Sequence, residues 1–241
     1  MNNTWNGFIC EEFIFQGKNA KIVFPKEDKN IKKIALKTEY WNAFPDVEIR
    51  LLEKGFYVAY IENETRFATK EDCQRKADFI QYLGEKYGLC KKCVPIGMSC
   101  GGAHAVRFAG LFPQYVSCLY IDAPVLNYCS FPGRLGDEEC ERVWEREFVF
   151  AYPGIKRYEL VSFSEHPLNM AESIIKNKIP VLMVYGTEDK SVIYEENGLL
   201  FEEAFEGTEL LRIIRVGCRG HHPHGLIGDN GEIVDFILEN S

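Results

Sequence analysis

The sequence predicts an α/β protein with a mostly parallel central sheet and helices on both faces of that sheet. Apolar runs typical of buried strands alternate with segments of helical period along most of the 241 residues. Strands that alternate with helices in this way lie parallel to one another. The composition, with 46% hydrophobic and 27% charged residues, is that of an ordinary globular chain and not of a disordered or fibrous one.

The expected elements follow one another in a regular order. Two opening strands flank a Gly-Lys-Asn turn at 17–19 and predict a hairpin of residues 12–16 and 20–24. The later expected strands are residues 34–36, 56–61, 94–98, 118–121, 180–186 and 210–216. The expected helices are residues 44–54, 70–87, 100–112, 192–205 and 233–238.

The stretch 124–179 breaks this alternation after the sixth expected strand. It is rich in proline, glycine and aromatic residues. We therefore expect residues 1–123 and 180–241 to form the core and residues 124–179 to form a small inserted cap or lid. Its aromatic side chains are candidates for the wall of a pocket or for the cap's own core, and they include Trp144, Phe148, Phe150 and Tyr152.

The charge of the chain argues against nucleic acid as a partner. With 28 Lys and Arg against 36 Asp and Glu the net charge is −8, and an acidic surface repels a phosphate backbone. No apolar run reaches the roughly 20 residues of a bilayer-spanning helix, so we expect no membrane span. Residues 1–7 lack the basic start and apolar stretch of a signal peptide, which favours a cytoplasmic location. The sequence indicates no oligomeric state.

Residues 97–101, Gly-Met-Ser-Cys-Gly, fit the G-x-S-x-G pattern of a nucleophile elbow. A strand is expected before the pattern and a helix after it, so the serine stands on a tight turn between them. Gly97 and Gly101 supply the small residues that such a turn needs. A hydroxyl at a helix N-terminus also lies where a developing negative charge is stabilised. Ser99 is therefore the predicted nucleophile.

Cys100 is a less suitable nucleophile than Ser99. An elbow centred on Cys100 would place Met98 where a small residue is required. We expect the backbone N–H of Cys100 to serve as one donor of an oxyanion hole instead.

With this elbow in its context, the chain resembles the α/β-hydrolase family over nearly its whole length. The similarity includes the strand order, the elbow at Ser99, the insertion after the sixth strand and two later loops. The resemblance implies a serine hydrolase whose Ser, Asp and His follow one another in that chain order, and it implies no cofactor.

The resemblance places the acid of the triad in the loop after the strand that follows the cap. Asp189 stands there, in Gly-Thr-Glu-Asp at 186–189, and a carboxylate in this role holds a histidine in its working tautomer. Asp189 is also a plausible N-cap for the helix expected from residue 192. Asp122, at the end of the preceding strand, is the alternative acid, because some hydrolases carry their acid there.

Three of the five histidines stand together at 221, 222 and 224. The family's base usually follows a glycine in this loop, which favours His221 after Gly220, with His222 as the alternative base. The three histidines are also candidate metal ligands. The adjacency of two of them, the stiffness of Pro223 and the lack of a carboxylate-rich partner segment lead us to expect no metal.

A second oxyanion donor is expected from the loop after strand 34–36. Many relatives have His-Gly in this loop, whereas this chain has Lys-Thr-Glu-Tyr-Trp at 37–41. The change leaves the backbone N–H groups in place, so Glu39 or Tyr40 is the expected donor.

These residues favour hydrolysis of a carboxylic ester of a small molecule, through an acyl-enzyme on Ser99 with His221 as base and Asp189 as acid. A peptidase, a thioesterase or an acyltransferase would use the same groups. A hypothesis of another class is a binding protein that keeps the fold without catalysis. A third is a metal-dependent hydrolase that uses the three clustered histidines.

Overall fold

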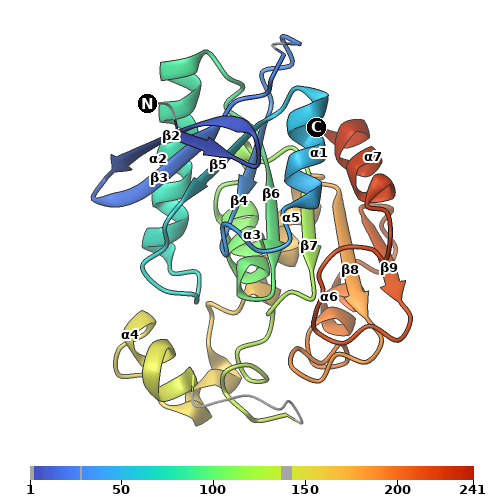
Figure 1. Cartoon of the computed structure of the whole chain (residues 1–241). Coiled ribbons are helices and arrows are strands. Elements are labelled where there is room, and N and C mark those ends of the chain that lie inside the picture. The colour runs from blue at the N-terminus through green and yellow to red at the C-terminus, as the bar shows by residue number, and fades with distance from the viewer. Residues whose placement is uncertain (1–2, 28, 137–142) are drawn as a thin grey trace.

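The computed structural model describes residues 3–27, 29–136 and 143–241 (Figure 1). Its strands are β1 (Asn3–Trp5), β2 (Phe8–Phe15), β3 (Lys18–Val23), β4 (Ile34–Lys37), β5 (Tyr57–Ile61), β6 (Cys93–Met98), β7 (Leu119–Asp122), β8 (Val181–Gly186) and β9 (Leu211–Val216). They form one sheet in the order β1-β2-β3-β5-β4-β6-β7-β8-β9. The pairs from β1 to β5 in this order are antiparallel, and every pair from β5 to β9 is parallel.

Helices pack on both faces of the sheet. They are α1 (Asp46–Lys54), α2 (Lys70–Tyr87), α3 (Cys100–Leu111), α4 (Val149–Ala151), α5 (Ala171–Lys176), α6 (Gly198–Ala204) and α7 (Gly231–Asn240). The buried residues of α1 and α7 join one apolar cluster, and those of α2, α3, α5 and α6 join the cluster on the opposite face. This arrangement confirms the predicted mostly parallel sheet with helices on both faces. Among the described residues, no helix is both long and apolar enough to cross a bilayer.

Glycines end α1 and α2. Gly55 follows α1 with a φ of 100°, and Gly88 follows α2 with a φ of 67°. Both lie in the left-handed region, which only glycine adopts without a steric cost. The N–H of Gly55 bonds back to the carbonyls of Leu51 and Leu52, so the chain turns sharply into β5.

Two elements differ from the sequence expectation. The short strand β1 was not expected, and the helix expected over 192–205 is confined to α6. Ahead of α6 the chain forms turns because side chains bind its backbone or hold it to neighbouring loops. The carboxylate of Asp189 accepts the N–H groups of Ser191 and Val192. The buried amide oxygen of Asn197 accepts two more from residues 126–127.

The described part of residues 124–179 contributes no strand to the sheet. Around α4 it forms short helical turns that lie beyond the carboxyl ends of the parallel strands (Figure 1), whereas α5, at its end, packs on one face of the sheet. Trp144 and Phe148 are buried in an apolar cluster of this segment, whereas Phe150 is 71% exposed. Glu147 accepts two hydrogen bonds from Arg66 of the loop before α2, which ties the segment to the sheet domain. Its expected role as a separate cap stays a prediction, and residues 137–142 lie outside the described residues.

The turn between β6 and α3 leaves no space for a side chain at two of its glycines. A Cβ on Gly97 would lie 2.3 Å from the carbonyl oxygen of Gly101, and a Cβ on Gly102 would lie 2.3 Å from Cβ of Pro124. A Cβ on Gly101 would lie 3.1 Å from Cβ of Glu39, which is a milder contact. The elbow therefore requires glycine at Gly97 and Gly102, and less strictly at Gly101.

We expect Gly97→Ala to lower the free energy of unfolding by about 1–3 kcal/mol, because the new methyl group overlaps backbone atoms that cannot move independently. Urea denaturation measures this loss. Gly217→Ala is the matched control, since a Cβ there meets nothing within 4 Å. The control should change the free energy of unfolding by less than about 0.5 kcal/mol. Equal stability of the two variants would contradict this account of the elbow.

Candidate active site

Ser99 occupies the turn between β6 and α3 in a strained backbone conformation. Its φ of 54° and ψ of −122° are unusual for a residue with a side chain, and such conformations gather at functional sites. Three backbone hydrogen bonds hold it: its N–H donates to the carbonyl of Asp122, and its own carbonyl accepts the N–H groups of Gly102 and Val125. The serine is thus fixed at the edge of the sheet where β6 and β7 end.

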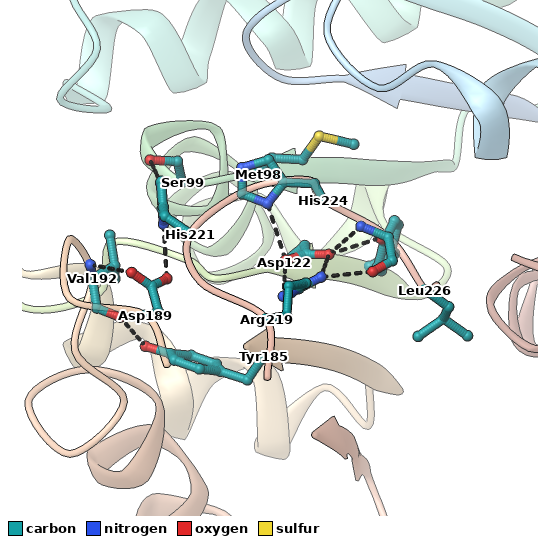
Figure 2. A network of polar contacts seen from close by, with 12 residues as sticks. Met98, Ser99, Asp122, Tyr185, Asp189, Val192, Arg219, His221, His224 and Leu226 are labelled. Carbon is teal, nitrogen blue, oxygen red and sulfur yellow. Dashed lines mark hydrogen bonds and ion pairs between the residues drawn. The ribbon is translucent and has the colours of Figure 1, made fainter. Parts of the chain in front are cut away.

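His221 connects this serine to Asp189 (Figure 2). The Oγ of Ser99 lies 3.0 Å from Nε2 of His221, and Nδ1 of the same ring lies 2.7 Å from Oδ2 of Asp189. An ionised carboxylate only accepts hydrogen bonds, so Nδ1–H donates to Asp189. Nε2 is then left without a proton and can accept the hydroxyl hydrogen of Ser99. The structure brings together the three residues that the sequence selects for a triad.

Asp189 is held in its ionised form despite its burial. Burial by itself raises the pKa of this carboxyl, but hydrogen bonds from His221 and from the N–H groups of Ser191 and Val192 outweigh it. The pKa of Asp189 is therefore lowered from its ordinary value. Oδ1 receives both N–H groups at 2.9 Å, which leaves Oδ2 for the histidine. Asp189 thus caps its own loop and orients His221 at the same time.

The loops that carry Asp189 and His221 are bound to each other. The N–H of Thr187 donates to the carbonyl of Val216, and the Thr187 hydroxyl accepts the N–H of Cys218. A Cβ on Gly186 would lie 2.3 Å from the carbonyl oxygen of Arg219, so the two loops meet backbone to backbone. This contact fixes the separation between the acid and the histidine.

A cavity of about 430 Å³ opens beside Ser99 and His221. Its size is within the range of small-molecule sites, which run from about 300 to 1,000 Å³. Phe44, Phe131 and Val143 give it apolar walls, and the last two come from the segment between β7 and β8. Polar groups in the wall include Tyr40 and Arg66. The cavity suits a small, largely apolar ligand that reaches the serine hydroxyl.

Solved structures of known proteins share this architecture. Acylaminoacyl peptidase of Pyrococcus horikoshii superposes with a TM-score of 0.72 at 15% identity, over 96% of this chain and 41% of that one. Est1E from Butyrivibrio proteoclasticus superposes with a TM-score of 0.66 at 17% identity, over 96% of this chain and 98% of that one. Dipeptidyl peptidase 4 of Porphyromonas gingivalis gives 0.71 at 16%, over 97% and 36%. The chain has the α/β-hydrolase fold.

The share of the other chain that is covered differs between the peptidases and Est1E. The chain spans less than half the length of the two peptidases and almost the full length of Est1E. No protein-family model and no curated protein matches the sequence. The likeness therefore establishes the fold of the chain.

Asp122, the alternative acid, is engaged elsewhere in this α/β-hydrolase fold (Figure 2). Arg219 donates to both of its oxygens, at 3.0 and 2.7 Å, and the N–H of Gly225 donates to Oδ2 at 2.7 Å. Nδ1 of His224 lies 3.0 Å from Oδ1. Because these groups surround the carboxylate and His221 bonds to Asp189 instead, Asp122 holds the histidine loop in place from below.

His222, the alternative base, does not bond to Ser99. Its ring is exposed and stacks on Phe44 with 5.6 Å between ring centroids. Burial of part of the ring and the neighbouring His221 and His224 lower the pKa of His222. One ring nitrogen of each of the three histidines lies within 4.8 Å of the others. Neither the adjacency of two histidines nor Pro223 therefore keeps the three rings apart.

The two segments expected to supply oxyanion donors, the start of α3 and the loop after β4, both lie at the elbow. Cys100 is the first residue of α3, where backbone N–H groups lack acceptors within the helix. Glu39 packs against Gly101, so the loop after β4 does reach the elbow, as expected. The N–H of Tyr40, however, donates to the carboxylate of Glu39 at 3.3 Å. The Tyr40 side chain lines the cavity with Ser99, and burial, the largest influence, raises the pKa of its hydroxyl, which stays protonated.

Several residues of the site belong to no motif that the sequence shows. Phe44, Arg66 and Val143 line the cavity, yet each stands in a segment without a motif. Arg219 is 3% exposed and forms the buried ion pair with Asp122. The available signal in the sequence was its place two residues before the predicted base. Its burial, which calls for a carboxylate partner, is seen only in the structure.

Asp122→Asn should lower the free energy of unfolding by about 3–5 kcal/mol, because it leaves the charge of Arg219 buried without a counter-ion. Denaturation in urea at neutral pH measures this change. Asp229→Asn is the matched control: Asp229 pairs with Arg50 at the surface, where its side chain is 72% exposed. The control should change stability by less than about 1 kcal/mol. A loss of that small size for Asp122→Asn would show that the buried pair does not hold the loop.

Proposed function

We propose that this protein is a serine hydrolase that cleaves a carboxylic ester of a small molecule. The observation that carries the proposal is the continuous chain of contacts from Ser99 Oγ to His221 Nε2 at 3.0 Å and from His221 Nδ1 to Asp189 Oδ2 at 2.7 Å. These are the roles of nucleophile, base and orienting acid that acyl transfer requires.

The proposed reaction proceeds in two halves. Ser99 Oγ attacks the ester carbonyl while Nε2 of His221 takes its proton, and the oxygen of the tetrahedral intermediate is held by the Cys100 N–H. The imidazolium then returns the proton to the departing alcohol, which leaves an acyl group on Ser99. Water, deprotonated by the same nitrogen, attacks this acyl-enzyme and releases the acid. Asp189 stays ionised throughout and stabilises the positive charge on His221.

The cavity supports a small substrate. Its volume of about 430 Å³ leaves room for a short acyl group and a compact alcohol. The apolar walls from Phe131 and Val143 favour an uncharged acyl group, because a charge placed there would lose its hydration. We propose that residues 124–179 act as a cap, since they supply these two walls.

A peptidase is the second candidate, and the peptidases among the similar structures favour it. An amide needs the same nucleophile and base, but its leaving amine must receive a proton from His221 more completely. A thioesterase or an acyltransferase would differ only in the leaving group or in the acceptor of the acyl group. An inactive binding protein would have no need for the strained Ser99 and its contact with His221.

A fluorophosphonate probe should label wild-type protein on Ser99, because the phosphorus centre takes the place of the ester carbonyl. Mass spectrometry of peptides locates the label. Ser99→Ala should lose the label and nearly all p-nitrophenyl acetate turnover. Ser191→Ala is the control, since Ser191 lines the same cavity and the change removes only its hydroxyl, while the backbone N–H that bonds to Asp189 is kept.

Labelling of Ser99→Ala, or full turnover by that variant, would refute the proposal. Comparing p-nitrophenyl acetate with aminoacyl p-nitroanilides on the wild type separates the two candidates. A larger kcat/KM for the anilides would favour the peptidase.

A further inference from the structure

The rings of His221, His222 and His224 converge on one small volume beside the cavity. Their centroids lie 4.7, 5.1 and 5.0 Å apart, and their planes cross at 63°, 80° and 89°. One nitrogen of each ring lies within 4.8 Å of the others. Rings set at wide angles around one volume aim nitrogen lone pairs from different directions, as the ligands of one metal ion do.

Two of these rings are backed by carboxylates. Nδ1 of His221 lies 2.7 Å from Asp189, and Nδ1 of His224 lies 3.0 Å from Asp122 (Figure 2). A histidine whose Nδ1–H bonds to a carboxylate presents Nε2 to a metal, and a carboxylate is one of the groups that commonly orient histidine ligands in metalloproteins. The surroundings of His221 and His224 therefore fix the tautomer that metal binding needs.

His222 supplies the third ligand. Its side chain is exposed to solvent and stacks on the ring of Phe44. With Zn²⁺–N distances of about 2.0–2.1 Å, tetrahedral ligand nitrogens are about 3.4 Å apart. The present separation of at most 4.8 Å exceeds this value by at most about 1.4 Å, so small movements of the three side chains suffice to bind the ion.

We propose that His221, His222 and His224 bind one Zn²⁺ ion and that this ion inhibits the hydrolase. The inhibition follows from the shared nitrogen: Nε2 of His221 accepts the proton of Ser99 in the proposed reaction, and a nitrogen bound to zinc cannot accept it. This consequence rests on the proposed function, whereas the binding of zinc does not.

The chemistry of the three ligands selects the ion. Imidazole nitrogens bind Zn²⁺, Cu²⁺ and Ni²⁺, whereas Mg²⁺ and Ca²⁺ prefer oxygen ligands. Three nitrogens with a fourth position open to water from the cavity match the common three-ligand form of protein zinc sites. We therefore expect no binding of Mg²⁺ or Ca²⁺ to this site at concentrations where Zn²⁺ binds.

Isothermal titration of the chelator-treated full chain with ZnCl₂ tests the site directly. Wild type should bind one equivalent, and His222→Asn should bind it at least about tenfold more weakly, since even the partners that orient a ligand contribute that much. His222→Cys should keep the equivalent, because a thiolate is also a zinc ligand. Wild type and both variants share the exposed thiols, such as Cys90 and Cys218, so zinc bound by these thiols does not affect the difference between the proteins. With Co²⁺ in place of zinc, His222→Cys should add a thiolate charge-transfer band.

Hydrolysis of p-nitrophenyl acetate provides the second measurement, with each variant compared with its own metal-free rate. Zn²⁺ should suppress the wild-type rate and a chelator should restore it, while His222→Asn should need at least about ten times more Zn²⁺ for the same suppression. Ser99→Ala should bind Zn²⁺ as tightly as wild type. If that variant still hydrolyses the ester, the proposed function fails and the zinc site stands.

Three results would overturn the zinc proposal. One is the absence of a zinc equivalent in wild type, and another is equal zinc affinity in wild type and His222→Asn. The third is hydrolysis that disappears on chelation and returns with Zn²⁺, which would make the metal an activator in place of an inhibitor.

Discussion

The carboxylate of Asp189 divides its two oxygens between its own loop and His221, and the geometry of the site depends on that division. Oδ1 binds the N–H groups of Ser191 and Val192, and Oδ2 faces Nδ1 of His221. Because the backbone fixes the carboxylate, the ring is held in one tautomer with Nε2 toward Ser99. Loss of either set of bonds would free the ring of His221. The turn that Asp189 caps therefore also determines the contact between His221 and Ser99.

The loop that carries His221 is fixed from two sides. Asp189 holds the histidine ring, and the buried pair of Asp122 and Arg219 holds the backbone beneath it. This second support also orients His224 and so gathers three imidazoles at the mouth of the cavity. The arrangement that prepares a base for acyl transfer is thereby also suited to a metal, and the two uses compete for one nitrogen.

The sequence predicts best what is encoded locally. The elbow at Ser99 was found because strand, glycines and helix are contiguous, and the parallel sheet because its strands are continuous apolar runs. Asp189 and His221 were found only through the resemblance, since nothing in their own segments says that they meet. The sequence does not indicate Arg219 or the cavity residues Phe44, Arg66 and Val143, because their partners are distant in the chain. The helix expected over 192–205 was too long because helical periodicity does not register side chains such as Asn197 that bind loop backbone.

The central claim is that Ser99, His221 and Asp189 act as one unit. Residues that act as a unit give non-additive losses when they are removed together. The most direct test is kcat/KM for p-nitrophenyl acetate in Ser99→Ala, His221→Ala and the double variant. The account predicts that the double variant is no slower than the slower single variant. Losses that multiply in the double variant would contradict it, because they would mean that the two side chains contribute independently.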